Sequence, residues 1–302
     1  MTEPFEPYIT EPGVYSIPVA DYLRDPVVGG SLSNSGAKKL MPPSCPALYK
    51  AWKDGPEEHS PAFDFGRAYH ARVLGAGEEI VVVDTASWQK KTAQKEHDEA
   101  YAAGHIPILA KDDEVIDAMV PVLRAHPIAS ALMNPDLGEP EQTLVWRDPE
   151  SGVMCRALVD FLRKPTPGRR LLVPDLKSAR AVDPKSIAKA LWEYGYYGQG
   201  PWYTDGAEKL GLSAGPPAFV LIFQMKEPPY LVVCAEPDPD AVGWGHARNR
   251  KARDLYLHCT ERDHWPGYAD DEVLKVQLPQ YAIYELEAAQ TLGHLEPEGA
   301  VL

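Results

Sequence analysis

The sequence predicts a mixed α/β (α+β) protein in which a β-sheet is flanked by helices, with further helices near the N-terminus. Two observations support this fold class. Helix-type patterns dominate residues 32–133, and apolar strand-type runs then follow at 141–146, 153–163 and 171–177, separated by turn-forming residues. Because no repeat or change of composition divides the 302 residues, we expect a single domain.

Short helices are expected first along the chain. A Ser-capped helix should lie within 32–41, where two prolines end it, and a second should lie within 46–53. Ser60 followed by Pro61 predicts a longer helix, because serine caps free N–H groups and proline fits the first helical turn. This longer helix contains His70.

Strand-type and helix-type patterns alternate in the next segment. Residues 79–84 predict a strand, and the polar residues 86–103 predict a helix. A further helix is expected at 112–133, interrupted at Pro121 and Pro127 because a proline inside a helix lacks the N–H donor.

The three apolar runs after residue 140 are predicted to form a meander of neighbouring strands. The later elements are expected in this order: a helix from Asp183 that continues to Tyr196 until glycines and Pro201 disturb it, strands at 218–224 and 230–234, and a long helix from Asp238. Within one domain this gives an N-terminal helical part, 13–135, a sheet-containing part, 139–262, and a C-terminal extension of uncertain order, 265–302.

Charge and composition disfavour several classes of protein. A formal net charge of −14 argues against broad coating of nucleic acid, so any DNA contact must be a local groove. The four cysteines lack Cys-x-x-Cys spacing, which disfavours a zinc ribbon and a disulfide framework. No stretch predicts a membrane span, and the acidic, proline-rich N-terminus is unlike a secretion signal, so we expect a cytoplasmic protein.

Two acids and a lysine on the expected strands suggest metal-dependent phosphodiester chemistry. Asp175 and Lys177 point to the same face of a strand because side chains alternate, and Asp160 lies on the preceding strand. Carboxylates bind Mg²⁺, and an ammonium group can orient water or offset charge that develops on a phosphate. Asp-x-Lys alone is a weak signal, since a solvated strand end has the same pattern.

Several other motifs accompany the Asp-x-Lys in a fixed order. They occupy residues 13–22, 32–36, 45–49, 65–74 with a Gly-x-x-x-His pattern, 152–160 and 175–178. In this combination, residues 13–260 resemble the exonuclease VIII (RecE) branch of the PD-(D/E)xK nuclease superfamily, within its RecB-type nucleases. The resemblance implies a nuclease core with a central mixed β-sheet flanked by helices.

The resemblance also implies a role for each residue that matches the motifs. His70, Asp160, Asp175 and the Leu176 carbonyl would bind the metal, and Asp160, Asp175 and Lys177 would act in catalysis. The chemistry itself leaves open plainer roles for some of them. A lone histidine on a helix is commonly packed in the core, and Lys177 has the pattern of ordinary surface charge.

Gln199 and Tyr203 match a Gln-x-x-x-Tyr element that lies near the catalytic site in this branch of nucleases. Its interior departs from the family pattern, because Gly200 and Pro201 replace apolar helix-forming residues. This interruption is expected to displace Tyr203 from its place one helical turn from Gln199, and packing at a helix end is the alternative role for both residues.

Two other positions bear on the site. Leu158 stands where relatives often have an arginine, so Arg156 or the basic turn 164–170 would have to supply the charge. Glu141 resembles a family acid that approaches a second metal. Basic residues that could contact DNA, or that simply form solvated faces, are Lys164, Arg169 and Arg170 on the turn and Arg248, Arg250 and Lys251 on the last helix.

The function implied by the resemblance is a Mg²⁺-dependent exodeoxyribonuclease, with Mn²⁺ able to substitute. It would degrade one strand of linear double-stranded DNA from the 5′ end to mononucleotides, leaving a 3′ single strand. The implied partners are double-stranded DNA ends and a single-strand annealing recombinase, and the implied assembly is a ring of identical chains. The expected setting is the cytoplasm of a bacterial or phage-infected host cell.

Three other functions remain as alternatives. One is a different nuclease of the superfamily, with another polarity; an iron–sulfur type is disfavoured because a close cysteine triplet is missing. Another is a DNA-binding recombination scaffold without catalysis, which the intact set of acids and lysine disfavours. The third is a structural or interaction protein that uses its aromatic surface.

Overall fold

The computed structural model describes residues 5–55 and 60–296, which belong to two compact units, Met1–Trp265 and Pro266–Leu302. All the buried apolar clusters found in the described residues lie in the first unit. The second unit contains α11 (Gln280–Thr291), a helix with no buried residue. The site residues expected from the sequence are all in the first unit.

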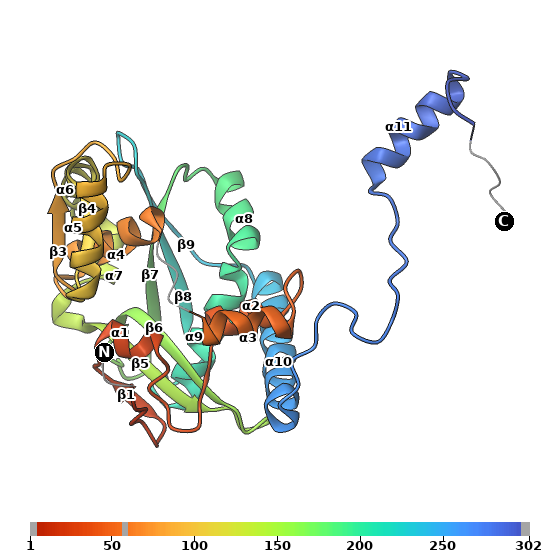
Figure 1. Ribbon diagram of the computed structural model, residues 1–302. Helices are drawn as coiled ribbons and strands as arrows, with labels where there is room; N and C mark the ends of the chain where they lie inside the picture. Colours follow the sequence, from red (N-terminus) through yellow and green to blue (C-terminus); the bar gives the residue numbers. More distant parts are fainter. Residues whose placement is uncertain (1–4, 56–59, 297–302) are drawn as a thin grey trace. The chain divides into compact units, whose positions relative to one another are not determined.

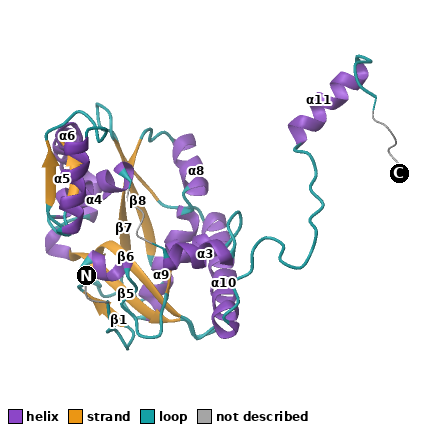
Figure 2. Cartoon of the chain, viewed as in Figure 1, coloured by secondary structure: helices purple, strands orange, loops and turns teal. Residues whose placement is uncertain are grey.

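Two mixed ladders of strands form the central sheet of the first unit (Figures 1 and 2). The first ladder has the order β1 (Gly13–Tyr15), β5 (Gly138–Arg147), β6 (Met154–Arg163), β2 (Leu32–Ser33), with β6 antiparallel to β5 and parallel to β2. In the second ladder, β8 (Ala218–Met225) is parallel to β7 (Leu172–Ala179) and antiparallel to β9 (Val232–Ala235). The mixed sheet with flanking helices confirms the predicted fold class.

The two ladders meet at β6 and β7, where a side chain makes the connection. The strands are in contact, and the Leu176 N–H donates to Asp160 Oδ2 at 2.6 Å. The predicted meander is therefore correct for β5 and β6 but wrong for β7, whose ladder partner is β8. The reason is topological: β7 and β8 are parallel, and parallel strands need a helical crossover, here α8 and α9.

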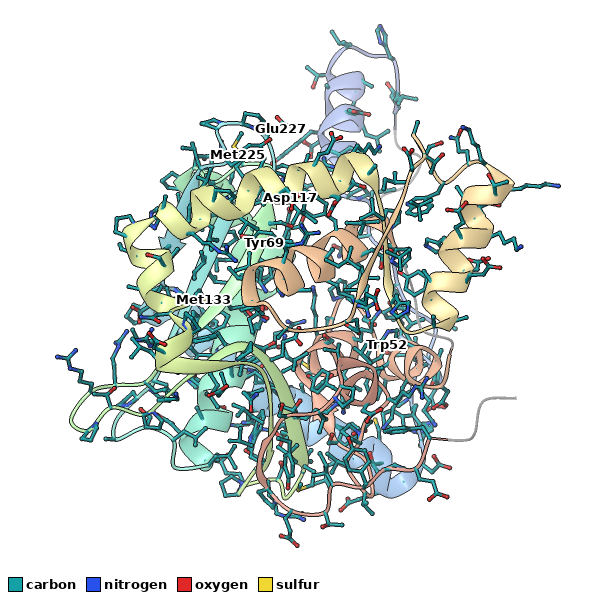
Figure 3. All side chains as sticks on the ribbon, turned by 90° about the vertical axis from the view of Figure 1, so that its left-hand side faces the viewer. Trp52, Tyr69, Asp117, Met133, Met225 and Glu227 are labelled. Atoms are coloured by element: carbon teal, nitrogen blue, oxygen red, sulfur yellow. The ribbon has the colours of Figure 1, made fainter. Side chains whose placement is uncertain are left out.

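One side of the sheet carries a helical layer with a small parallel strand pair (Figure 1). Its elements are α4 (Pro61–Leu74), β3 (Ile80–Val83), α5 (Lys91–Ala102), β4 (Ile106–Leu109), α6 (Ala110–Ala125) and α7 (Pro127–Leu132). Figure 3 shows α6 lying over α4 and Tyr69. The buried Tyr69 hydroxyl donates to Gln224 Oε1 on β8 at 2.6 Å, which fixes α4 against the second ladder.

Two expectations for this layer are wrong. The helix expected at 112–133 is not interrupted at Pro121, because α6 continues through it and ends only at His126. There the imidazole Nδ1 accepts from Ala129 N at 3.2 Å and begins α7. The strand β4 was not expected, since it has only four residues and contains Pro107, yet all four are buried.

Within the described residues, no single helix has the length and apolar character to cross a membrane. The bent pair Ala110–Ala125 and Pro127–Leu137 meets the criteria of length and composition only when both helices are taken together.

The other side of the sheet is covered by helices from both ends of the first unit (Figure 1). These are α2 (Asn34–Leu40), α3 (Pro46–Asp54), α8 (Pro184–Glu193), α9 (Tyr196–Lys209) and α10 (Pro239–Arg262). The Ser-capped helix expected within 32–41 is confirmed as α2. Leu32 belongs to β2, and Ser33 caps α2 by accepting from Gly36 N at 3.1 Å.

The helix from Asp183 breaks earlier than expected, and α9 then passes through the glycines and Pro201 without interruption. The break lies at Gly195, whose positive φ of 70° suits glycine. Inside α9 the glycines allow close packing: a Cβ on Gly200 would lie 2.8 Å from the Phe219 ring. Pro201 leaves the carbonyl of residue 197 without its helical donor, and Gly245 of α10 packs directly against that carbonyl.

Candidate active site

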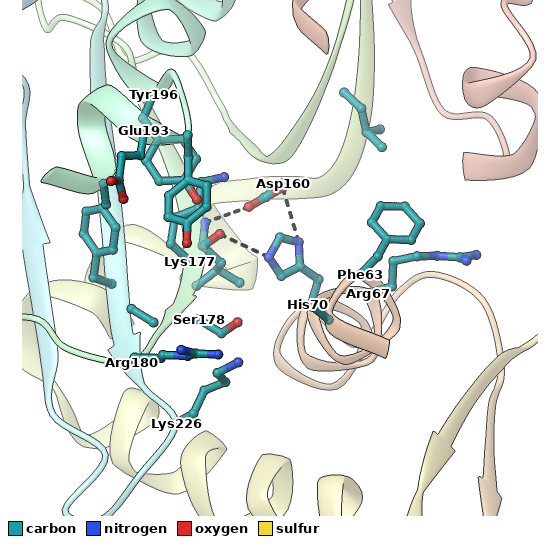
Figure 4. Close-up of a pocket in the computed structure, with 18 of the residues that line it drawn as sticks. Phe63, Arg67, His70, Asp160, Lys177, Ser178, Arg180, Glu193, Tyr196 and Lys226 are labelled. Atoms are coloured by element: carbon teal, nitrogen blue, oxygen red, sulfur yellow. Dashed lines mark hydrogen bonds and ion pairs between the residues drawn. The ribbon is translucent and has the colours of Figure 1, made fainter. Parts of the chain in front are cut away.

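A cleft of about 800 Å³ opens beside the junction of β6 and β7. Its lining comes from α1 (Val19–Leu23), α4, β5, β6, β7 and α8, so segments far apart in the sequence meet there. Figure 4 shows His70, Asp160 and Lys177 close together in this cleft, with Arg180 and Lys226 farther along it, beyond Ser178. The cleft therefore contains five of the candidate site residues singled out from the sequence: His70, Glu141, Asp160, Leu176 and Lys177.

His70 faces the Leu176 carbonyl and the Asp160 carboxylate. Its Nε2 lies 3.1 Å from Leu176 O, and its Nδ1 lies 3.5 Å from Asp160 Oδ1. Burial, and then the nearby Lys177 charge, lower the pKa of His70 to about 4. The imidazole is therefore neutral at pH 7, with one N–H and one nitrogen lone pair.

Asp160 has one oxygen on the protein backbone and the other toward His70. Burial raises the pKa of its carboxyl group, while Lys177 and the Leu176 N–H oppose that rise. The side chain retains 13% exposure, so it is accessible from the cleft. Asp160 consequently joins the two ladders and also presents a carboxylate oxygen to the site.

Asp175 and Gln199 are buried beneath the cleft and are linked to Lys177, which lines it. Gln199 Nε2 donates to Asp175 Oδ1 at 2.9 Å, and the Lys177 ammonium group forms an ion pair with Asp175 Oδ2. Burial raises the pKa of Asp175 to about 6, although Lys177 lowers it in part. Lys177 also lies 4.8 Å from the centre of the Tyr196 ring, a favourable cation–π contact.

Tyr203 and Gln199 lie one turn apart on α9, because the helix is continuous between them. The departure from the family pattern therefore does not separate them. Tyr203 is buried, and burial together with the nearby Asp175 raises the pKa of its hydroxyl. Both side chains lie behind the Asp175 carboxylate.

Glu141 lies in the cleft on β5, next to Asp160. The register of β5 and β6 would place these two residues opposite each other, but the ladder omits that pair, and Glu141 has a positive φ of 48°. Burial, followed by the neighbouring Glu78 and Asp160 charges, raises the pKa of Glu141 to about 7. Arg67, which forms an ion pair with Glu78, partly offsets that repulsion.

The basic residues expected to contact DNA lie outside the lining of this cleft. On the turn after β6, Lys164 Nζ lies 3.8 Å from Glu139 and Arg170 pairs with Glu236 at 2.5 Å, while Arg169 is exposed. On α10, Arg250 Nε lies 3.7 Å from Glu150, and Lys251 is exposed. Arg248 instead lies over the Tyr197 ring at 5.7 Å.

Arg156 does not replace the arginine expected at Leu158. Leu158 lines the cleft, whereas Arg156 is buried behind it in an ion pair with Asp25 at 3.0 Å. Arg156 Nη1 also donates to Ser31 O at 2.9 Å. Its role is to anchor the N-terminal segment to β6.

Apart from Lys177, the Lys and Arg side chains that line the cleft were not singled out from the sequence. They are Arg67, Arg180, Lys189 and Lys226. Arg180 follows β7 and Lys226 follows β8, so the parallel pairing of these strands brings both to the same end of the sheet. Proximity to Lys177 along β7 was the one available sequence signal, and it applied to Arg180 alone.

The group around His70 fits a bound cation, although its side chains do not form a complete cage. Since neutral His70 has one N–H and faces two oxygens, one of these contacts sets a lone pair against an oxygen atom. A cation between them would remove that repulsion, and the oxygen-rich set suits Mg²⁺ or Mn²⁺. In the described part of the chain, no group of three His, Cys, Asp or Glu side chains is arranged to hold a metal. The role of Asp175 as a ligand stays a prediction.

The sequence matches a family model described as a PDDEXK-like domain of unknown function (DUF3799) over residues 33–273. The chain belongs to this family. The structure is similar to the crystal structure of a putative exonuclease from Eubacterium rectale, with a TM-score of 0.55 and 13% sequence identity, covering 84% of this chain and 92% of that one. No curated protein matches the sequence. The PD-(D/E)xK superfamily expected from the motifs is thus confirmed, and its exonuclease VIII branch stays a prediction.

Proposed function

We propose that this PDDEXK-like protein is a divalent-metal-dependent nuclease that cleaves DNA in the cleft beside β6 and β7. The observation that carries the proposal is the convergence of His70, Asp160, the Leu176 carbonyl and Lys177 at one point of that cleft. The similarity of the fold to that of a putative exonuclease from Eubacterium rectale supports the proposal.

In this mechanism some side chains would bind the metal ion and others would stabilise charge on the phosphate. Asp160, His70 and the Leu176 carbonyl would hold Mg²⁺ or Mn²⁺, with Asp175 adjacent. When bound, the cation would polarise the phosphate and lower the pKa of an attacking water. Lys177 stays protonated, because Asp175 and Asp160 outweigh the cost of its burial and raise its pKa to about 12. It can therefore donate a hydrogen bond and offset negative charge on the phosphate, but it cannot accept a proton from water.

Gln199 positions this lysine indirectly. By donating to Asp175 Oδ1, it fixes the carboxylate whose other oxygen pairs with Lys177. Farther along the cleft, Arg180 and Lys226 offer charges for neighbouring phosphates (Figure 4). A local basic groove of this kind lets a chain of net charge −14 hold DNA.

We further propose 5′-to-3′ exonuclease action on linear duplex DNA, and this finer part rests on the exonuclease VIII resemblance alone. The same resemblance supports a ring of identical chains around the duplex and a single-strand annealing recombinase as partner. Enclosure would retain an acidic protein on DNA without strong contacts at any one point.

Digestion of end-labelled linear duplex DNA tests both levels of the proposal. With Mg²⁺ or Mn²⁺ we expect cleavage that excess EDTA abolishes; full activity in EDTA contradicts the metal-dependent nuclease. The 5′ label should leave as a mononucleotide while the complementary strand persists, and covalently closed circles should resist attack. Early loss of a 3′ label, or cutting of closed circles, overturns only the polarity and end requirement.

A further inference from the structure

An exposed group of aromatic rings extends from the cleft along the turn between α8 and α9. Trp192 is 73% exposed and Tyr194 is 59% exposed, so both rings are open to a ligand. Tyr194 and Tyr196 line the cleft and lie 5.6 Å apart between ring centres. Trp192 stacks on Tyr197, with centres 5.7 Å apart and planes inclined by 15°.

Two cations lie against the same turn. Lys38 Nζ donates to Tyr194 O at 2.8 Å, and the Arg248 guanidinium covers the Tyr197 ring at 5.7 Å. Within the described residues neither cation has an acidic partner in an ion pair, and the nearby acid Glu193, at the end of α8, pairs with Lys189 instead. Burial, and then the charge of Arg248, lower the pKa of Lys38, so the two cations repel each other.

We propose that this aromatic rim, comprising Trp192, Tyr194, Tyr196 and Tyr197 with Lys38 and Arg248, binds an unpaired DNA strand. Exposed rings give bases a stacking surface, and a phosphate between Lys38 and Arg248 would relieve the repulsion between them. A duplex hides the faces of its bases, so the rim discriminates in favour of single-stranded DNA. The inference rests on the proposed function in so far as it treats the adjoining cleft as a DNA site.

Binding of a fluorescently labelled oligodeoxythymidylate, followed by anisotropy in EDTA, tests the rim without cleavage. Trp192→Ala should weaken binding on the order of tenfold, the usual loss when one base loses its aromatic partner, and Trp192→Phe should restore most of it. Trp244→Ala is the matched control, because Trp244 is 72% exposed on α10 and is not one of the rim residues. That variant should bind as the wild type does.

An abasic oligonucleotide of the same length separates stacking from charge. It should bind more weakly than the thymidylate, and Trp192→Ala should leave its affinity unchanged. Arg248→Gln should weaken binding of both strands and lower the salt dependence by about one counterion. Melting temperatures of all variants should stay near that of the wild type, since these side chains are exposed or half-buried.

The inference is overturned if Trp192→Ala and Trp244→Ala bind the thymidylate equally well, or if Trp192→Ala weakens abasic binding to the same extent. Its failure is distinct from failure of the proposed function. If the protein is a nuclease but Trp192→Ala does not change strand binding, only the proposal that the rim binds single strands is refuted. If single-strand affinity depends on Trp192 but the protein shows no metal-dependent cleavage, only the proposed nuclease function is refuted.

Discussion

Lys177 has a charged neighbour on one side and an aromatic ring on the other. Asp175 forms an ion pair with its ammonium group, and Tyr196 supplies a ring face 4.8 Å away. A buried lysine without such partners would tend to lose its proton, but here the ammonium form is favoured. The side chain is therefore suited to stabilising negative charge near the Asp160 carboxylate.

Replacing Lys177 by Met should lower the rate of metal-dependent DNA cleavage on the order of a hundredfold or more, because the charge-stabilising group is lost. Initial rates on linear duplex DNA measure the effect. Lys185→Met is the matched control, since Lys185 is exposed near the start of α8 and does not line the cleft. Equal cleavage rates for the two variants would show that Lys177 has no role in catalysis.

Glu141 should make the stability of the protein depend on pH. Its pKa is raised from 4.5 to about 7 in the fold, so the folded state binds this proton more tightly than the unfolded state does. The group destabilises the fold progressively as pH rises from about 4.5, and the full effect is present above about 7.

Glu141→Gln should therefore raise the free energy of unfolding at pH 8, on the order of 1–3 kcal/mol, because the buried charge is removed. The difference should vanish near pH 4. Urea unfolding in EDTA at both pH values measures it. A variant that is less stable than the wild type at pH 8 would show that the Glu141 carboxylate has a stabilising partner.

Helix α9 shows how glycine and proline serve packing at the scale of an element. Its glycines allow the sheet to approach, with Phe219 against Gly200 and Trp146 against Gly206. On its other side, Asn249 Nδ2 of α10 donates to Gly198 O at 2.8 Å. This close packing holds Gln199 against Asp175, so the precision of the site depends on two helix surfaces.

The contact between α9 and α10 can be tested by two glycines on α10. A Cβ at Gly245 would lie 2.0 Å from Tyr197 O, whereas one at Gly243 would meet no atom within 4 Å. Gly245→Ala should lower the free energy of unfolding by about 1–3 kcal/mol, as overpacking does. Gly243→Ala should raise it by up to about 1 kcal/mol, because alanine favours helix. Urea denaturation measures the free energy of unfolding of both variants. A change of the same sign in both would contradict the close packing of α9 and α10.

At the scale of the whole molecule, local signals were predictable and long-range pairing was not. Ser60 begins α4 as expected, since its hydroxyl accepts from Phe63 N at 3.2 Å, and that places His70 on a helix. The pairing of β7 with β8 depends on a crossover that no short pattern encodes. Lys226 was missed for that reason: it reaches the cleft only because β8 lies beside β7.

In the candidate site, too, the residues specified by local patterns were predictable and those that depend on long-range packing were not. The motif positions His70, Asp160 and Lys177 could be chosen from the sequence because strand alternation and the family motifs specify them, and the fold brings them to one cleft. The basic residues were chosen by charge and, for those of the 164–170 turn, by their place between two strands of the site. Arg170 and Arg250 pair with surface acids instead, because nearby carboxylates compete for exposed cations.

The first unit should fold without the second. Each buried cluster in the described residues ends at or before Trp265, which packs against Tyr49 with ring centres 5.4 Å apart. A chain that ends at Pro266 should unfold cooperatively with a melting temperature close to that of the full chain. Adding Trp265→Ala to that shorter chain should cost about 1–3 kcal/mol of stability, because its buried ring surface is lost. Calorimetry measures the stability of the shortened chain and of its Trp265→Ala variant. A shortened chain that is largely unfolded would contradict independent folding of the first unit.

Both backbone polar groups of Leu176 face the site: its N–H donates to Asp160, and its carbonyl lies toward His70. Its side chain is fully buried, so water cannot readily replace either contact. In a ¹⁵N-labelled sample this single amide should exchange slowly with deuterium and should change its resonance when Mg²⁺ enters. If the proposed cation binds beside Leu176, this backbone amide would report its arrival without substrate or an added probe.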